Sequence, residues 1–382
     1  MRDGWEIKKL GEVCDFQGGS QPPKEEWISE PREGYVRMLQ IRDFTQSRSF
    51  DIEYVKVSNR LKYCAEEDVL LGRYGASVGK VLTGLAGAYN VAIMKTIPDE
   101  TLLTKKFFKY FLMSPDFQAF LLQASTMRAA QAGFSREDIQ DYPFNLPPLS
   151  EQERIVAELD CLSSIIEKQK QQLKEYDTLA QSIFYDMFGD PDDSLYPRQS
   201  LKALAESNLS YGSGASAIEY DGEIRYIRIT DIMEDGKLDN NAMSPNVFDD
   251  RYLLNDGDIL FARSGATVGK TYHYKESDGK AIYAGYLIRF IPNRELVMPE
   301  YIYYYTRSPY YQAFIKKNAQ AVAQPNINAK QYGDLQVCVP PLDLQQQFAS
   351  KVEAIEKQKA ILKKNIEETE LLFNSRMDYY FN

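Results

Sequence analysis

Histidine is almost missing from this 382-residue chain, which contains only His273, in the sequence Thr-Tyr-His-Tyr. A metal site built from several histidines is therefore excluded, and any catalytic triad would have to use this one residue. Because His273 lies in an alternating apolar stretch, we predict a strand side chain rather than a catalyst.

Cysteine is also scarce, and Cys14, Cys64, Cys161 and Cys338 are scattered without any Cys-x-x-Cys pair. This spacing indicates neither a disulfide framework nor a thiolate metal site, which fits a reducing cytoplasm. The chain starts without a secretory n-region and has no apolar run long enough to span a bilayer. We therefore expect a cytoplasmic protein that does not enter a membrane.

Motifs for catalysis are missing as well. Gly75 and Gly79, like Gly265 and Gly269, are separated by three residues, whereas a phosphate-binding loop needs four before Gly-Lys-Ser/Thr. No glycine-rich cofactor loop follows a strand, no Asn/Asp-Pro-Pro-aromatic tetrapeptide occurs, and no Asp/Glu/Lys cluster resembles a nuclease site. We expect a chain that is not an enzyme and binds no cofactor and no metal.

Positive charge is in deficit, since 45 Lys and Arg face 55 Asp and Glu, for a net charge of −10. The excess acid lies in the second half and in the stretch 150–188, while residues 1–149 are close to neutral. This balance does not by itself indicate a nucleic-acid-binding protein. DNA binding would require a local basic face or a partner that neutralises phosphates.

The sequence does contain a tandem repeat of about half its length. Residues 68–80, Asp-Val-Leu-Leu-Gly-Arg-Tyr-Gly-Ala-Ser-Val-Gly-Lys, match residues 258–270, Asp-Ile-Leu-Phe-Ala-Arg-Ser-Gly-Ala-Thr-Val-Gly-Lys. In each copy short strand-like runs are followed by a helical pattern, at about 105–123 and 299–318, and later by Pro-Pro-Leu. The repeat predicts an α+β fold with two similar β-rich domains and two long helices. The predicted segments are a first domain at 1–149, a helix at 150–188, a second domain at 189–341 and a helix at 342–382.

Apolar residues recur at alternating spacings of four and three along both predicted long helices. This heptad pattern predicts an antiparallel coiled coil that holds the two domains apart. The alternative is that each helix packs only on its own domain. Ser150 with Glu153, and Asp343 with Gln346, have the spacing of a helix N-cap and its partner. The predicted contact residues between the helices are Ile155, Leu159, Leu162, Ile166, Leu173, Ile183, Phe348, Val352, Ile355, Leu362, Ile366 and Phe373.

Each copy also contains a glycine-rich turn flanked by cations, Arg73 and Lys80 in the first and Arg263 and Lys270 in the second. Exposed amides and cations suit DNA phosphates. The alternative is that the glycines only shape a hairpin, with the cations solvated or paired to Asp68 and Asp258. Polar loops before and after the turns carry side chains that can pair with base edges, although each could equally be a solvated loop. The predicted DNA-binding residues are Gln17, Ser20, Gln21, Arg37, Arg73, Tyr74, Ser77, Lys80, Arg128, Gln131, Tyr211, Ser213, Arg228, Arg263, Ser264, Thr267, Lys270, Gln324 and Asn326.

The repeat, its two hairpins and Leu-Pro-Pro-Leu-Ser-Glu-Gln-Glu-Arg-Ile at 146–155 resemble the specificity subunit of a type I restriction–modification system (HsdS family) over the whole chain. The resemblance implies two target-recognition domains, each reading one half of a split double-stranded DNA sequence. It also implies spacer helices that set the gap and dock two modification (methyltransferase) subunits. Those subunits would methylate adenine with S-adenosylmethionine, and a restriction (endonuclease and translocase) subunit can join them.

The second copy departs from this pattern where Gln346, Gln347 and Phe348 replace Glu153, Arg154 and Ile155. Because of this departure, the resemblance does not establish that the two helices are equivalent docking surfaces. From the residues alone, a coiled-coil adaptor with two protein-binding domains and no DNA binding stays open as an alternative. A fragment of a fused methylating enzyme is disfavoured by the missing cofactor motifs.

Overall fold

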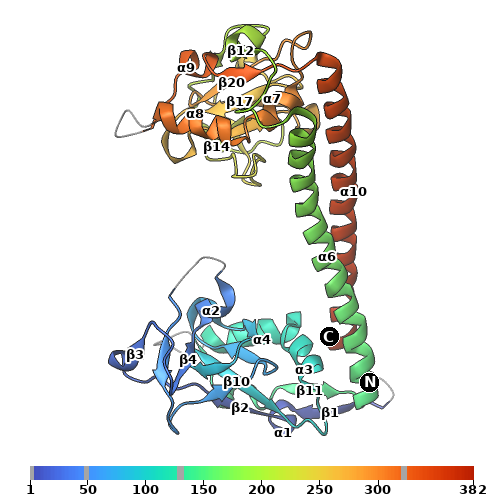
Figure 1. Ribbon diagram of the computed structural model, residues 1–382. Coiled ribbons are helices and arrows are strands. Elements are labelled where there is room, and N and C mark those ends of the chain that lie inside the picture. Colours follow the sequence, from blue (N-terminus) through green and yellow to red (C-terminus); the bar gives the residue numbers. More distant parts are fainter. Residues whose placement is uncertain (1–3, 47–50, 127–132, 320–324) are drawn as a thin grey trace. The chain divides into compact units, whose positions relative to one another are not determined.

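The chain forms two compact units, and each unit contains part of both long helices (Figure 1). The computed structural model describes residues 4–46, 51–126, 133–319 and 325–382. Unit 1 comprises Met1–Lys170 with Lys364–Asn382, and unit 2 comprises Gln171–Lys363. Unit 1 is therefore discontinuous in sequence, whereas unit 2 is a single stretch of chain.

Unit 1 is built on a four-stranded antiparallel sheet in the order β2-β10-β7-β8. A second sheet has the order β3-β5-β4-β9-β6, with β4 and β9 parallel, and β1 pairs with β11. The strands are β1 Glu6–Lys9, β2 Cys14–Gly18, β3 Trp27–Ile28, β4 Tyr35–Leu39, β5 Tyr54–Lys56, β6 Tyr63–Cys64, β7 Leu70–Gly72, β8 Val81–Leu82, β9 Gly87–Tyr89, β10 Ile93–Pro98 and β11 Pro143–Leu146.

Unit 2 repeats this arrangement, with a four-stranded antiparallel sheet in the order β13-β20-β17-β18. As in unit 1, the first strand of the half pairs with the last, β12 with β21, and a parallel pair is present, β15 with β19. The strands are β12 Arg198–Ser200, β13 Ser210–Tyr211, β14 Ala217–Glu219, β15 Arg225–Ile227, β16 Met243–Pro245, β17 Ile259–Ala262, β18 Thr271–His273, β19 Ala281–Tyr283, β20 Leu287–Phe290 and β21 Gln336–Cys338. The predicted α+β repeat is confirmed, and His273 lies on a strand as predicted.

The helix predicted within each domain is in fact two helices, so that prediction was wrong in detail. In unit 1, α3 (Lys105–Leu112) ends before α4 (Pro115–Thr126), and in unit 2, α7 (Pro299–Tyr305) ends before α8 (Pro309–Ala319). Each break falls at a Ser-Pro pair, because proline disfavours the helical conformation of the residue before it and cannot donate a backbone hydrogen bond. The short helices are α1 Leu10–Val13, α2 Ile41–Thr45, α5 Arg136–Ile139 and α9 Ala329–Gly333.

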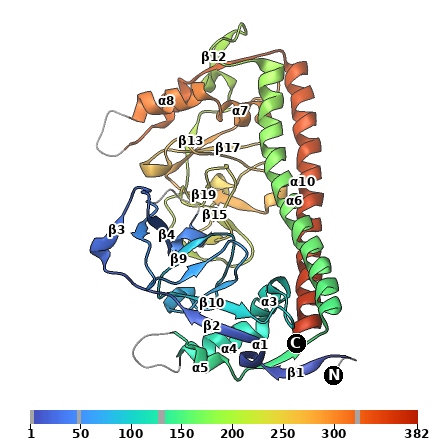
Figure 2. The ribbon, with the colours of Figure 1, turned by 60° about the horizontal axis from the view of Figure 1, so that its bottom comes forward.

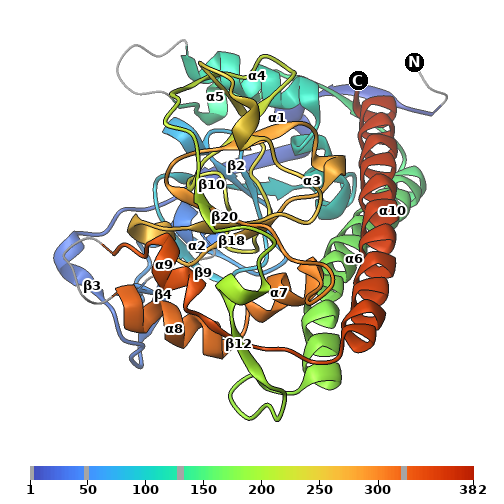
Figure 3. The same cartoon turned by 90° about the horizontal axis from the view of Figure 1, so that it is seen from above.

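The long helices α6 (Leu149–Phe188) and α10 (Leu342–Phe381) lie side by side and run antiparallel (Figures 1, 2 and 3). In unit 1, Lys170 of α6 is 2.6 Å from Glu370 of α10. In unit 2, Asp177 of α6 is 2.7 Å from Lys359 of α10. The predicted antiparallel pair is thereby confirmed. Both helices start at the leucine of Pro-Pro-Leu, so Ser150 and Asp343 lie inside the first turn and are not caps.

None of the predicted contact residues of the two helices is exposed. Ile155, Leu159, Phe348, Val352, Ile355, Leu362 and Ile366 are buried, and Leu162, Ile166, Leu173, Ile183 and Phe373 are half-buried. Towards the end of α6 the buried positions are Ala180, Phe184 and Phe188, and Phe184 lies one residue beyond the predicted Ile183. There Phe184 stacks on Tyr301 of α7 with ring centroids 5.5 Å apart, so packing on the globular body displaces the seam.

The globular core of unit 1 also packs on the long helices (Figure 2). Phe107 of α3 lies 5.2 Å from Phe381 of α10 between ring centroids, and Tyr110 donates a 2.7 Å hydrogen bond to Asp160 of α6. Apolar burial of aromatic rings contributes about 1.5–3 kcal/mol per side chain. The last turns of α10 are therefore part of the core of unit 1.

One buried glutamine attaches the start of each long helix to the body before it. The amide oxygen of Gln152 accepts a 2.9 Å bond from the backbone N–H of Thr104, and its nitrogen donates to the carbonyls of Leu102 and Pro147. Gln345 accepts from the N–H of Met298 over 2.9 Å and donates to the carbonyls of Leu296 and Pro340. Since Thr104 and Met298 precede α3 and α7, each glutamine couples the starts of two helices.

Candidate nucleic-acid interface

In unit 1, three segments that are distant in sequence meet beside Arg73. The Nε of Arg73 donates to the carbonyl of Phe134 over 3.2 Å, and Tyr74 pairs with Gly133 in an isolated bridge. The guanidinium carbon of Arg73 lies 4.7 Å from the ring centroid of Tyr74. Gly18, at the end of β2, is so close that a Cβ there would lie 3.0 Å from Nη1 of Arg73. The hairpin, the early loop and the late segment thus share one surface.

In unit 2 the corresponding segments meet beside Arg263. Its Nε donates to Oδ1 of Asn326 over 3.3 Å, and Ser264 pairs with Asn326 in an isolated bridge. The guanidinium carbon of Arg263 lies 4.8 Å from the ring centroid of Tyr211, which is 42% exposed. The hydroxyl of Tyr211 accepts a 3.0 Å bond from the N–H of Ala329. Both units therefore hold an arginine over a tyrosine ring at the junction of three segments.

A glycine in each early loop allows this junction to form. A Cβ on Gly19 would lie 2.0 Å from the carbonyl oxygen of Asn90, and one on Gly212 would lie 2.3 Å from that of Ala284. No side chain fits at such distances, so the loop backbone is in direct contact with the turn that precedes the strand β10 or β20. The neighbouring Ser20 bonds to the body, with its Oγ accepting from the N–H of Lys62, whereas Oγ of Ser213 accepts from the N–H of Ala215 within its own loop.

The two glycine-rich hairpins are turns whose hydroxyl side chains bond within the turn. Gly75 and Gly265 have φ of 52° and 67°, a conformation that favours glycine. The Oγ of Ser77 donates to the carbonyl of Tyr74 over 2.6 Å, and Oγ1 of Thr267 donates to that of Ser264 over 3.0 Å. Ser77 and Thr267 therefore stabilise the turn in the unbound chain.

The predicted cations differ in how free they are. Lys80 is exposed, whereas Lys270 is 2.9 Å from Glu234 and also donates to the carbonyl of Ile232. Arg37 and Arg228 are each bonded to a buried carboxylate, at 2.6 Å from Asp43 and Asp231 respectively. Among the predicted cations, Lys80, Arg73 and Arg263 form no ion pair with any residue in the described part of the chain.

Asp68 and Asp258 do not neutralise the hairpin cations. Asp68 pairs with Lys95 and, at 2.9 Å, with Lys105, and Asp258 pairs with Arg289 at 2.5 Å. Burial opposes ionisation of Asp68, but its lysines and the N–H of Ala65 outweigh it and lower the pKa to about 2. For Asp258 burial dominates and raises the pKa above its ordinary value. Each carboxylate is therefore bound to a cation on the central strand β10 or β20 of its four-stranded sheet.

The remaining predicted residues vary in accessibility. Gln17 accepts a 3.0 Å bond from the hydroxyl of Tyr89 and Gln21 is exposed. Arg128, Gln131 and Gln324 lie outside the described residues. Tyr286 is not among the predicted residues, but it is 63% exposed and its carbonyl accepts the N–H of Arg263 over 3.1 Å. Aligning Tyr283-Ala-Gly-Tyr with Tyr89-Asn-Val-Ala would have revealed it as an aromatic residue next to the hairpin.

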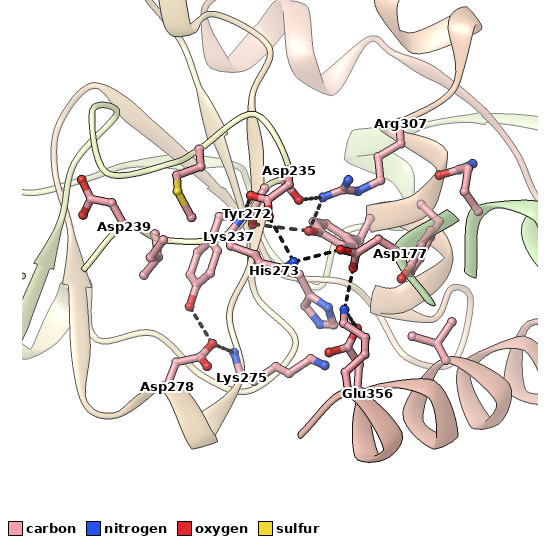
Figure 4. A pocket seen from close by; sticks show the side chains of 18 of the residues that line it. Asp177, Asp235, Lys237, Asp239, Tyr272, His273, Lys275, Asp278, Arg307 and Glu356 are labelled. Carbon is pink, nitrogen blue, oxygen red and sulfur yellow. Dashed lines mark hydrogen bonds and ion pairs between the residues drawn. The ribbon is translucent and has the colours of Figure 1, made fainter. Parts of the chain in front are cut away.

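Unit 2 also contains a polar cavity of about 700 Å³ between its β-rich body and the helix pair (Figure 4). On its wall the carboxylate of Asp177 on α6 accepts from Lys359 of α10 over 2.7 Å and from Lys237 over 3.1 Å. Lys237 also pairs with Asp235, whose carbonyl accepts from Arg307. Burial of His273, on the same wall, lowers its pKa to about 3, so it is neutral at physiological pH. These ionic bonds attach the 233–239 loop to Asp177 of α6, which also bonds to Lys359 of α10.

Comparison with known proteins identifies the family to which this chain belongs. A family model described as the type I restriction modification DNA specificity domain matches residues 2–175 and again residues 204–371. The chain belongs to this family. The first matched range contains the junction at Arg73, and the second contains the junction at Arg263.

Relatives of this specificity-domain family match nearly the whole chain. The specificity subunit of the type I restriction enzyme MjaVIII from Methanocaldococcus jannaschii is 21% identical over 96% of this chain and 90% of its own length. The EcoBI specificity subunit from Escherichia coli is 22% identical over 93% of this chain and 80% of its own. The fold is similar to that of a solved chain from work on complex assembly of the type I R-M system, with a TM-score of 0.61 and 16% identity, covering 100% of this chain and 98% of that one. The type I restriction-modification S subunit from M. genitalium gives a TM-score of 0.56 at 16% identity, covering 98% and 95%.

The described residues form neither a candidate metal site nor a candidate membrane-spanning helix. Within them, no group of three or more His, Cys, Asp or Glu side chains has an arrangement that could hold a metal ion. None of the helices in this part of the chain is both long and apolar enough to cross a membrane.

Proposed function

We propose that this chain is the DNA-recognition subunit of a type I restriction–modification enzyme. Each unit reads one half of a bipartite double-stranded target through the surface around Arg73 or Arg263. The observation that carries the proposal is the repeated junction of hairpin, early loop and late segment, present twice with different side chains. Two similar but non-identical surfaces on one chain suit a target whose two halves differ.

In this proposal the helix pair fixes the distance between the half-sites and docks two modification subunits. Each helix has 40 residues and is therefore ~60 Å long at 1.5 Å per residue. Half-sites one helical turn of DNA apart are separated by ~34–36 Å. A helix pair of this length is sufficient to span that separation.

The chain itself is proposed to carry no catalytic step and to bind no cofactor. S-adenosylmethionine would be bound by the modification subunits, which transfer a methyl group to adenine, and a restriction subunit would complete the nuclease. The net charge of −10 supports a division of labour in which partner subunits neutralise many of the phosphates. Such a complex would work in the cytoplasm.

The test is to co-express the chain with its modification subunit and to map methylated adenines in the host genome. One bipartite sequence, with two specific parts and a fixed gap, is the expected result. In titrations the assembled complex should bind this sequence far more tightly than the isolated chain does.

Two results would contradict parts of this proposal. Specific nanomolar binding by the isolated chain at ~0.15 M salt would contradict the dependence on a partner. A complex without affinity for any DNA at any salt concentration would instead support an adaptor that binds only proteins.

A further inference from the structure

The two units share an arginine but differ at each of the four positions that surround it. The arginines are equivalent because the N–H of Arg73 bonds to the carbonyl of Ala92 and that of Arg263 bonds to the carbonyl of Tyr286. The strand registers make Gly18 equivalent to Tyr211, since these residues pair with Met94 and Ile288 of the matched strands β10 and β20. The isolated bridges make Tyr74 equivalent to Ser264 and Gly133 equivalent to Asn326.

In unit 1 the four positions are Gly18, Tyr74, Ala92 and Gly133. The aromatic ring under the arginine comes from the hairpin, as Tyr74. Two glycines make room for this arrangement. A Cβ on Gly133 would lie 2.4 Å from Cδ1 of Tyr74, and one on Gly18 would lie 3.0 Å from Nη1 of Arg73. The ring of Tyr74 therefore requires glycine at position 133, and the guanidinium of Arg73 lies close against position 18.

In unit 2 the same positions are Tyr211, Ser264, Tyr286 and Asn326. The ring under the arginine now comes from the early loop, as Tyr211, at the place where unit 1 has glycine. With serine on the hairpin, the late segment can carry a larger residue, and Asn326 provides the acceptor for Nε of Arg263. Tyr286, whose carbonyl accepts the N–H of Arg263, adds a second exposed aromatic residue. The residues thus differ as a matched set.

Both arginines keep their terminal amino groups free within the described part of the chain, because only Nε is bonded to the protein. A planar guanidinium with two free amino groups matches O6 and N7 of guanine in the major groove. The tyrosine under it restricts its orientation, and the direction of that restriction differs between units since the ring comes from different segments. Phosphates are the same at every DNA site, so a phosphate contact would not require the residues around the arginine to differ between the units.

From this geometry we propose that Arg73 and Arg263 each read a guanine edge, and that the four surrounding positions determine which base pairs each unit accepts. The inference rests on the proposed function, and it assigns the two arginines to bases rather than to phosphates. Tyr74 and Tyr211 act as positioning residues for the arginines. Tyr286 contacts the base pair next to the guanine in the second half-site only, because unit 1 has Ala92 at that position.

The main experiment transfers the unit 1 set into unit 2 of the full complex, as Tyr211→Gly, Ser264→Tyr, Tyr286→Ala and Asn326→Gly together. Methylated sites in the host genome are then compared with those of the original complex. The second half-site should change at the base pairs next to its guanine, and the first half-site should stay the same. A variant that assembles with its partner and still methylates the original second half-site would overturn the inference.

A single change keeps the test decisive if the fourfold variant does not fold. Tyr286→Ala removes a side chain that is 63% exposed and should leave folding intact. It should reduce discrimination at one base pair of the second half-site by about tenfold. Tyr220→Ala is the matched control, since Tyr220 is 44% exposed in the same unit and is not among the four positions. Equal specificity for Tyr286→Ala and the original complex would contradict the proposed contact.

Arg263→Lys distinguishes a guanine contact from a phosphate contact. Lysine keeps the charge but lacks the planar fork, so discrimination at the guanine should fall about tenfold while affinity for unrelated DNA is unchanged. Unchanged discrimination would assign Arg263 to a phosphate. An original complex that shows no sequence preference at all would instead refute the proposed function, and the two failures are therefore distinguishable.

Discussion

Lys359 of α10 donates a 2.7 Å hydrogen bond to Asp177 of α6 from a position that is only 5% exposed, inside the seam between the two helices. When the helices are aligned at Pro147 and Pro340, the residue that matches Lys359 is Ile166. A charged residue at one position of a helix seam favours a single register, at some cost in stability. Unit 2 thus contains a charged contact where the first helix has an apolar one.

The first prediction concerns this contact. Asp177→Ala should lower the free energy of unfolding by about 2 kcal/mol, below the ~3–5 kcal/mol typical of a broken buried pair, because Glu356 still neutralises Lys359. Urea denaturation measures the loss. Adding Lys359→Met should restore most of it, since the uncompensated charge is then removed. Glu368→Ala, which breaks an exposed pair with Lys364, should change stability by less than ~0.5 kcal/mol.

The second prediction concerns the glutamines at the helix starts. Gln345→Ala should destabilise unit 2 by about 3 kcal/mol, because the N–H of Met298 and the carbonyl of Pro340 lose their buried partner. Hydrogen exchange should show faster opening at the start of α7 and α10 in particular. Gln347→Ala, two residues further along and exposed, should stay within ~0.5 kcal/mol of the original chain. Similar losses for both variants would contradict the coupling role.

The third prediction is a pH dependence that comes from the single histidine. Burial lowers the pKa of His273 to about 3 in the folded chain, whereas the unfolded value is 6.5. Because the unfolded state binds the proton more readily in this window, stability falls as the pH drops below 6.5, by about 2 kcal/mol between pH 7 and pH 5. His273→Phe should flatten this part of the profile in thermal unfolding. An unchanged slope between pH 7 and pH 5 would show that other groups determine it.

The fourth prediction separates the two hairpin lysines. In the assembled complex, Lys80→Ala should weaken cognate and unrelated DNA about equally and lower the salt slope by about one, as loss of a phosphate contact does. Lys270→Ala should have a smaller effect, because Lys270 already pairs with Glu234 at 2.9 Å. A Glu234→Gln variant is the matched control and should make position 270 behave more like position 80. If Lys80→Ala changes neither affinity nor slope, the hairpin does not face a phosphate.

The sequence predicted the long helices well because their period and their Pro-Pro-Leu starts are local signals. It did not reveal that Gln152 and Gln345 are buried, since that depends on where the 102–104 and 296–298 segments lie in the folded chain. Helical periodicity alone predicts one helix over 105–123, whereas Pro115 separates α3 from α4. Local pattern and proline chemistry conflict there, and proline decides the outcome.

For the candidate interface, the sequence identified Arg73, Tyr74, Arg263 and Tyr211 as separate loop residues. Which tyrosine supports which arginine depends on strand register, because Gly18 and Tyr211 become equivalent only through pairing with β10 and β20. Lys270 illustrates the opposite case. Its motif matches that of Lys80, but its partner Glu234 comes from the separate 233–239 loop, which lies outside the hairpin motif.

The division of the long helices between the units determines the order in which the chain can fold during synthesis. Unit 2 is continuous from Gln171 to Lys363, so all its residues are synthesised before the last segment of unit 1. Unit 1 begins first but needs Lys364–Asn382, and its Phe107 packs on Phe381, near the end of the chain. Part of the aromatic core of the amino-terminal body therefore stays uncovered until the carboxyl-terminal helix has left the ribosome. Domains usually mature from the amino terminus onward, and in this chain the order of completion is reversed.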